Sequence, residues 1–95
     1  MTLQEIAERR KEIDQIGEKY GIRSIHLFGS VARGSADEKS DVDFLVSTDP
    51  GVSLLGLGGF QVEVEQLLGI KVDVVTAEGL RPRIRQRAIQ EAVAL

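Results

Sequence analysis

The stretch FGSVARGSADEKSDVDFLV, residues 28–46, decides the fold and the chemistry of this 95-residue chain. It places a Gly-Ser pair at the end of one apolar run and two aspartates, Asp41 and Asp43, at the start of the next. Side chains alternate between the two faces of a β-strand, so both carboxylates would share one face while Val42 and Phe44 point to the other. Two like charges on one face repel each other, so a counter-charge is expected beside them.

A third carboxylate stands in a later apolar run. Asp73 lies between Val72 and Val74, where a lone charge would be costly without a partner. If the two acidic strands are neighbours, three carboxylates can converge. Mg²⁺ suits such a cluster because it takes oxygen ligands and keeps positions for water and substrate phosphates. The sequence therefore predicts a Mg²⁺ site at Asp41, Asp43 and Asp73.

The Gly-Ser pair supplies the features of a phosphate site. Gly29 at a strand end lets backbone N–H groups approach a ligand closely, and a following helical turn adds its positive N-terminal end. Ser30 can donate a hydroxyl hydrogen bond to the same phosphate, and Arg33, one turn further on, can add a positive charge. A triphosphate would lie between these donors and the metal, an arrangement that serves phosphoryl or nucleotidyl transfer.

Helical and strand patterns alternate along the chain. Helical spacing is expected at residues 3–19, at residues 52–68 and from Pro82 onward. Strand patterns are expected at residues 23–28, 41–47 and 71–76. A helical turn and a loop are expected at residues 30–40, and a tail or short final strand at residues 91–95. This order predicts one α/β domain over residues 1–95, with a small three-stranded mixed sheet and flanking helices.

Composition limits the classes of function. The net charge is −3, so duplex nucleic acid is not an expected partner, although Arg81, Arg83, Arg85 and Arg87 are clustered. The chain has no cysteine, and neither a signal peptide nor a membrane span is expected, so we expect a cytoplasmic protein without membrane contact. A chain of this length has a modest core, which leaves a homo-oligomer or a hetero-oligomer open.

These motifs resemble those of the DNA polymerase beta-like nucleotidyltransferases, and among them the minimal nucleotidyltransferases (MNT). The family pattern is Gly-Ser, two variable residues and Arg-Gly, followed by Ser-Asp-x-Asp in an apolar strand. It is complete here as GSVARG, residues 29–34, and SDVDFLV, residues 40–46. The third acidic residue of the family matches Asp73. The resemblance covers nearly the whole chain and implies the polymerase beta-like nucleotidyltransferase core.

The resemblance also implies an activity and a partner. It implies Mg²⁺, an NTP donor that is commonly ATP, and genetic pairing with a helical HEPN-type protein that looks like an RNA-cleaving toxin. The small transferase would act as antitoxin by attaching AMP to a tyrosine of that protein. Gly29 and Ser30 would hold the triphosphate, with Arg33 beside them. Asp41 and Asp43 would bind Mg²⁺, and Asp73 would complete the metal site or take the proton of the acceptor hydroxyl.

Two other functions stay open at this point. The domain could keep the pattern yet neutralise its partner only by binding, or it could be the catalytic half of a small-molecule nucleotidyltransferase that resembles the aminoglycoside-modifying enzymes. Single residues also have structural alternatives. Arg33 could be a surface residue that pairs with Asp37 or Glu38, and Asp73 could pair with Arg33 or Lys71.

Four further features are expected to be structural. His26 falls on a strand face with other partly exposed residues, so it is not expected to be a ligand. The run GLGG, residues 56–59, lacks the lysine and the spacing of a P-loop and is expected to permit close helix packing. Tyr20 is expected to cover the edge of the core. The arginines of residues 81–87 are expected to be solvated on a helix, with an acidic partner surface or RNA as the alternative.

Overall fold

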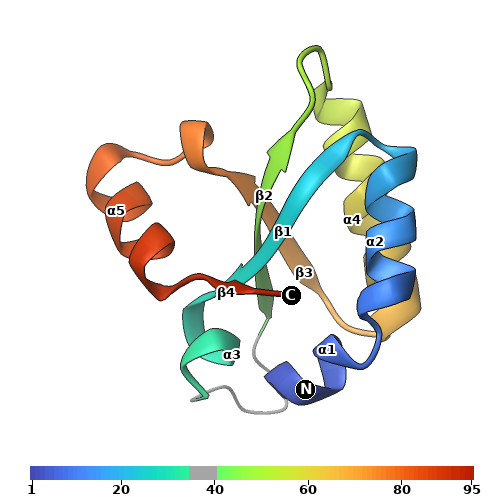
Figure 1. The fold of residues 1–95 in the computed structure, drawn as a ribbon, viewed down its shortest axis with the longest axis horizontal. Coiled ribbons are helices and arrows are strands. Elements are labelled where there is room, and N and C mark those ends of the chain that lie inside the picture. The colour runs from blue at the N-terminus through green and yellow to red at the C-terminus, as the bar shows by residue number, and fades with distance from the viewer. Residues whose placement is uncertain (35–40) are drawn as a thin grey trace.

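The computed structural model describes residues 1–34 and 41–95. The chain forms a four-stranded sheet in the order β3-β2-β1-β4, with α2 and α4 on one face and α5 on the other (Figure 1). The helices are α1 (Leu3–Ala7), α2 (Arg10–Lys19), α3 (Gly29–Arg33), α4 (Leu54–Leu68), the short 3₁₀ turn η1 (Ala77–Gly79) and α5 (Pro82–Glu91). The strands are β1 (Ile22–Phe28), β2 (Val42–Thr48), β3 (Val72–Thr76) and β4 (Val93–Ala94).

The sheet is mixed, as the sequence predicts. Strand β1 runs antiparallel to β2 and β4, whereas β2 and β3 are parallel and joined by α4. The α/β fold with flanking helices is confirmed, but the count of three strands was too low. The fourth strand has only two residues and pairs Val93 with Leu27, so it is too short for an alternating pattern to show.

The core lies between the sheet and the helices α2 and α4. The rings of Phe44 on β2 and Phe60 on α4 meet edge to face, with their centroids 6.2 Å apart. Eight side chains there are less than 2% exposed: Phe44, Phe60, Ile6, Ile13, Leu27, Val42, Val64 and Val72. Residues of β2 alternate between this core and the opposite face, so the face that carries Asp43 points away from α2 and α4.

The predicted first helix, residues 3–19, is wrong in one respect, because the chain forms two helices there. Thr2 caps α1 in a reciprocal arrangement with Glu5, and α1 ends at Ala7. The Arg9 N–H then bonds the carbonyl of Ile6, three residues back, and α2 starts after it. The break falls in a run of charged residues, where the spacing of apolar residues gives no signal.

Within residues 1–34 and 41–95, no helix is both long enough and apolar enough to cross a membrane.

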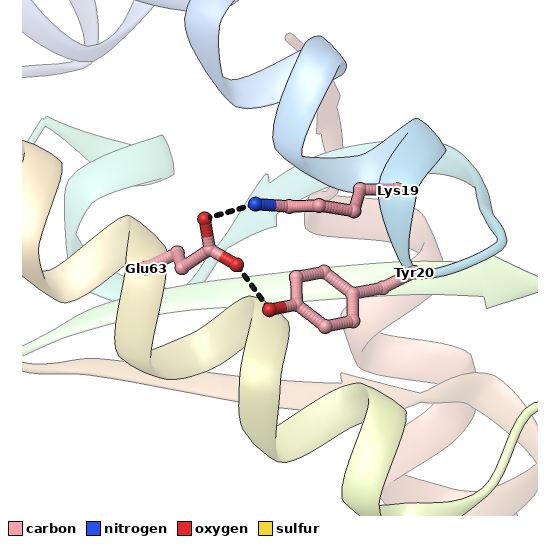
Figure 2. A network of polar contacts seen from close by, with 3 residues as sticks. All are labelled: Lys19, Tyr20 and Glu63. Carbon is pink, nitrogen blue, oxygen red and sulfur yellow. Dashed lines mark hydrogen bonds and ion pairs between the residues drawn. The ribbon is translucent and has the colours of Figure 1, made fainter.

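A polar network fastens α2 to α4 at the edge of the core. Figure 2 shows Glu63 of α4 between two residues at the end of α2: Lys19 Nζ lies 2.5 Å from its Oε1, and the Tyr20 hydroxyl donates to its Oε2. The Tyr20 ring lies against Gly59, which has no side chain to block it. Tyr20 thus covers the core edge, as predicted. Of the predicted GLGG run, Gly59 permits close packing against Tyr20, whereas Gly58 has no such contact.

Two glycine substitutions in α4 should have opposite effects. A Cβ at position 58 would meet no atom within 4 Å, so Gly58→Ala should stabilise the fold by about 0.5–1 kcal/mol through helix propensity. The same change at Gly59 would put Cβ 2.5 Å from the Tyr20 ring, which must swing away from Glu63. We expect Gly59→Ala to be less stable than Gly58→Ala by roughly 1–2 kcal/mol. Urea unfolding of both variants checks this, and equal stabilities would contradict the packing described.

The arginines of residues 81–87 do not behave as one solvated group. Arg85 is partly buried and donates to two backbone carbonyls, with Nε 2.7 Å from the oxygen of Ala77 and Nη2 3.2 Å from that of Leu80. It fixes η1 to α5, so the prediction of a solvated side chain is wrong for Arg85. Arg81, Arg83 and Arg87 are exposed, as predicted.

Candidate active site

The turn from β1 into α3 requires glycine at position 29. Gly29 has φ +76°, a left-handed conformation that side-chain-bearing residues rarely adopt. A Cβ at this position would also collide with the carboxylate of Asp43. The Asp43 side chain therefore lies directly against the Gly29 backbone. Ser30 and Arg33 follow within α3, so the three residues of the predicted phosphate site lie on one short segment.

Asp43, on β2, is paired with one residue on each of the two neighbouring strands. On β1 it is paired with Phe28, the residue before Gly29, and on β3 it is paired with Asp73. Paired residues of neighbouring strands project to the same face, so the carboxylates of Asp43 and Asp73 share the face opposite the core. Asp41 directly precedes β2 and is two residues from Asp43.

The three aspartates differ in exposure. Asp43 is partly buried, whereas Asp41 and Asp73 are exposed. The expectation that Asp73 stands in a buried apolar run is thus wrong. Its neighbour Val72 is 1% exposed because alternate residues of β3 face the core, and Asp73 faces solvent. Asp73 consequently needs no counter-charge to be tolerated.

Burial raises the pKa of the Asp43 carboxyl above its ordinary value, and the negative charges of Asp73 and Asp41 raise it further. The Arg33 guanidinium lowers this pKa in part. Asp73 and Asp41 therefore both repel the Asp43 carboxylate, and such repulsion is what the sequence predicts.

This shift makes stability depend on pH. A raised pKa means that the folded protein binds the Asp43 proton more tightly than the unfolded chain, whose value is near 3.8. The stabilising effect is present below the unfolded pKa and is lost as pH rises through the folded pKa. In EDTA, Asp43→Asn should therefore gain stability relative to wild type as pH rises from about 3.5 to about 7.

Urea unfolding across this range measures the difference, with the exposed Asp14→Asn of α2 as the matched control. A wild type that gains stability over Asp43→Asn with rising pH would contradict the shift.

The donor chemistry of the site fits a hard divalent cation. Its carboxylate oxygens are the ligands that Mg²⁺ prefers, and a cation would neutralise the repulsion that raises the pKa of Asp43. The three carboxylates, however, do not form the compact cluster that the sequence predicts. Among the residues with described positions, no three candidate ligand side chains lie close enough together to hold a metal ion. Asp41 and Asp73 are exposed, whereas Asp43 is partly buried.

Arg33 has a partner that the sequence does not indicate. Its Nη1 lies 3.0 Å from Oε2 of Glu91, the last residue of α5, 58 positions along the chain. Only the fold brings the two together, since no motif links them. The alternative partners Asp37 and Glu38 lie outside the described residues. In the described ranges, Asp73 forms no ion pair with Arg33 or Lys71.

The similarity of this chain to known proteins extends over almost its whole length. A family model described as nucleotidyltransferase domain matches residues 4–95. The chain belongs to the nucleotidyltransferase domain family. This nucleotidyltransferase is 38% identical over 97 residues to the protein adenylyltransferase MntA of Thermococcus cleftensis, a match that covers 98% of this chain and 95% of that protein.

Solved structures agree with this assignment. A structure assigned to a minimal nucleotidyltransferase matches with a TM-score of 0.89 at 39% identity, over 100% of this chain and 97% of that one. A Shewanella oneidensis complex of a tri-AMPylated HEPN toxin with an MNT antitoxin contains a chain that matches with a TM-score of 0.69. That match covers 93% of this chain and 69% of the other, and at 16% identity it shows the shared fold alone. The resemblance to the minimal nucleotidyltransferases is confirmed, and the chain is a nucleotidyltransferase.

Proposed function

We propose that this nucleotidyltransferase uses Mg²⁺ and ATP to attach AMP to a tyrosine hydroxyl of a HEPN-type toxin, and that it acts in this way as an antitoxin. The observation that carries the proposal is the position of Asp43. Its carboxylate lies against the Gly29 backbone on one side and beside Asp73 on the other. A phosphate held at the Gly29 turn would therefore be adjacent to the carboxylates that a transferase needs.

The partner is proposed from relatives. A relative that is 38% identical over almost the whole chain is named as a protein adenylyltransferase, which supports a protein acceptor. The fold also occurs in a complex with a HEPN toxin that carries AMP. Because ATP and such a toxin meet inside the cell, we place the reaction in the cytoplasm.

Each residue has a proposed part in the reaction. The Gly29 backbone and the Ser30 hydroxyl hold the triphosphate, with the charge of Arg33 next to them. Asp41 and Asp43 hold Mg²⁺, with Asp73 as a third ligand or as the base. When bound, the metal neutralises charge on the phosphates and orients them for in-line attack.

Transfer then requires one bond to form and one to break. The acceptor oxygen bonds to the α-phosphorus, the bond from that phosphorus to the α–β bridging oxygen breaks, and pyrophosphate leaves with the bonding electrons. The hydroxyl proton must pass to a base, and Asp73 is suited to this because it is exposed on the same face as Asp43.

A labelling experiment tests the proposal. The purified chain is incubated with ATP labelled at the α-phosphate, Mg²⁺ and the small helical protein encoded by the neighbouring gene. We expect the label on a tyrosine of that protein, identified by tandem mass spectrometry, and no transfer in EDTA. A partner that binds the chain but stays unlabelled with ATP and Mg²⁺ would overturn the proposal.

A further inference from the structure

A hollow of about 170 Å³ lies between α3 and α5, next to the Gly29 turn. Six of the residues that line it are Gly29, Arg33, Ile84, Arg87, Ala88 and Glu91. The four from α5 follow one another at spacings of three, one and three residues, so they form a single face of the helix that is directed toward α3. The hollow therefore shares a wall with the turn at which the triphosphate is proposed to bind.

The residues that line this hollow carry more positive than negative charge. Arg33 is neutralised by its ion pair with Glu91, at 3.0 Å. Arg87 lines the same hollow but is exposed and forms no ion pair within residues 1–34 and 41–95. The wall thus carries one positive charge in excess, on a side chain that is free to turn toward a ligand.

We propose that Arg87 binds the β- and γ-phosphates of the nucleotide from the α5 side of the site. The inference rests on the proposed function, which places the triphosphate at Gly29. An arginine suits this position because its guanidinium stays charged and can bond two phosphate oxygens at once. Gly29 lies against the Asp43 carboxylate and also lines this hollow, so a guanidinium on α5 could bind the outer phosphates of a nucleotide held at that turn and stabilise the charge of the departing pyrophosphate.

Arg83 provides a matched control on the same helix. It is exposed like Arg87 but does not line the hollow, so its replacement removes the same charge from α5 without touching the proposed contact. Binding of ATP and of AMP, each with Mg²⁺, is measured by calorimetry for wild type, Arg87→Gln, Arg87→Lys and Arg83→Gln. Thermal unfolding of each variant checks that the fold is kept.

Arg87→Gln should weaken ATP binding about tenfold and leave AMP binding unchanged, because AMP lacks the two outer phosphates. Arg87→Lys should restore part of the ATP affinity, and Arg83→Gln should bind ATP like wild type. Unchanged ATP affinity in Arg87→Gln overturns the inference. So does an equal loss of ATP and AMP binding, or an equal loss in Arg83→Gln.

The two proposals fail in different ways. If wild type binds ATP and labels its partner while Arg87→Gln does the same with equal affinity, only the role of Arg87 is lost. If Arg87→Gln loses ATP affinity selectively while wild type labels no partner, the role of Arg87 stands and the acceptor is wrong. If wild type does not bind ATP at all, both proposals are overturned.

Discussion

Replacing Asp43 with asparagine should reduce AMP transfer at least about 100-fold while the protein stays folded. Asparagine keeps the shape of the side chain but removes the negative charge by which, in the proposed mechanism, Asp43 would hold the metal. The fold should tolerate the change because Asp43 is repelled by Asp41 and Asp73 in the metal-free protein. Asp41→Asn should have a similar effect on transfer. Initial rates with labelled ATP and partner measure the loss.

Asp14→Asn controls for the chemistry of the substitution, since Asp14 is exposed on α2 away from the site. It should transfer AMP like wild type. An Asp43→Asn variant that transfers AMP at the rate of Asp14→Asn would show that the charge of Asp43 has no part in catalysis.

The second large effect is expected at Gly29. Gly29→Ala forces a side chain into a backbone with φ +76°, which costs about 1–2 kcal/mol, and its Cβ would displace the Asp43 carboxylate. We expect transfer to fall at least about 100-fold, because the change would displace Asp43, the proposed ligand of the metal. Urea unfolding and initial rates should be measured on the same preparation.

Gly69→Ala serves as a control that has the backbone strain of Gly29→Ala without the displacement of Asp43. Gly69 ends α4 with φ +71°, and a Cβ there meets no atom within 4 Å. It should lose a similar amount of stability from the backbone strain and keep its activity. If Gly29→Ala were as active as Gly69→Ala, the contact between Gly29 and Asp43 would have no functional meaning.

Much of the fold follows from local rules. The strands from Ile22, Val42 and Val72 begin within a residue of the positions that the alternating pattern predicts. Pro82 starts α5 and Gly69 ends α4, where the chemistry of helix ends favours each residue. The same alternation places Asp43 opposite the core, because Val42 and Phe44 must be buried.

The remainder depends on contacts that no local pattern encodes. The break before Arg10 falls among charged residues, and the two-residue strand β4 is held only by pairing with β1. Arg85 looks like its neighbours in sequence, yet the position of η1 makes it a donor to two carbonyls. Whether a residue pairs, caps or stays solvated was decided by tertiary structure.

The candidate site, too, could be predicted from the sequence only in part. The motif around Gly29 and Asp43 could be recognised in the sequence, because it depends on spacing along the chain and on the strand period. The Glu91 partner of Arg33 could not be recognised, since the two residues are far apart in sequence. The exposure of Asp73 was also missed. Its valine neighbours suggested burial, whereas residues of β3 alternate between the core and the opposite face, and Asp73 faces water.

Catalysis, and not occlusion, is the proposed means by which the chain silences its partner. The most direct measurement is co-expression of the partner with wild type or with the Asp41→Asn, Asp43→Asn double variant, followed by the mass and the toxicity of the partner. Occlusion would use surfaces outside the carboxylates, so it should survive the double change. We expect a partner that gains the mass of AMP and is harmless with wild type, but stays unmodified and toxic with the variant. A partner that is silenced equally by both proteins, with no change in mass, would contradict it.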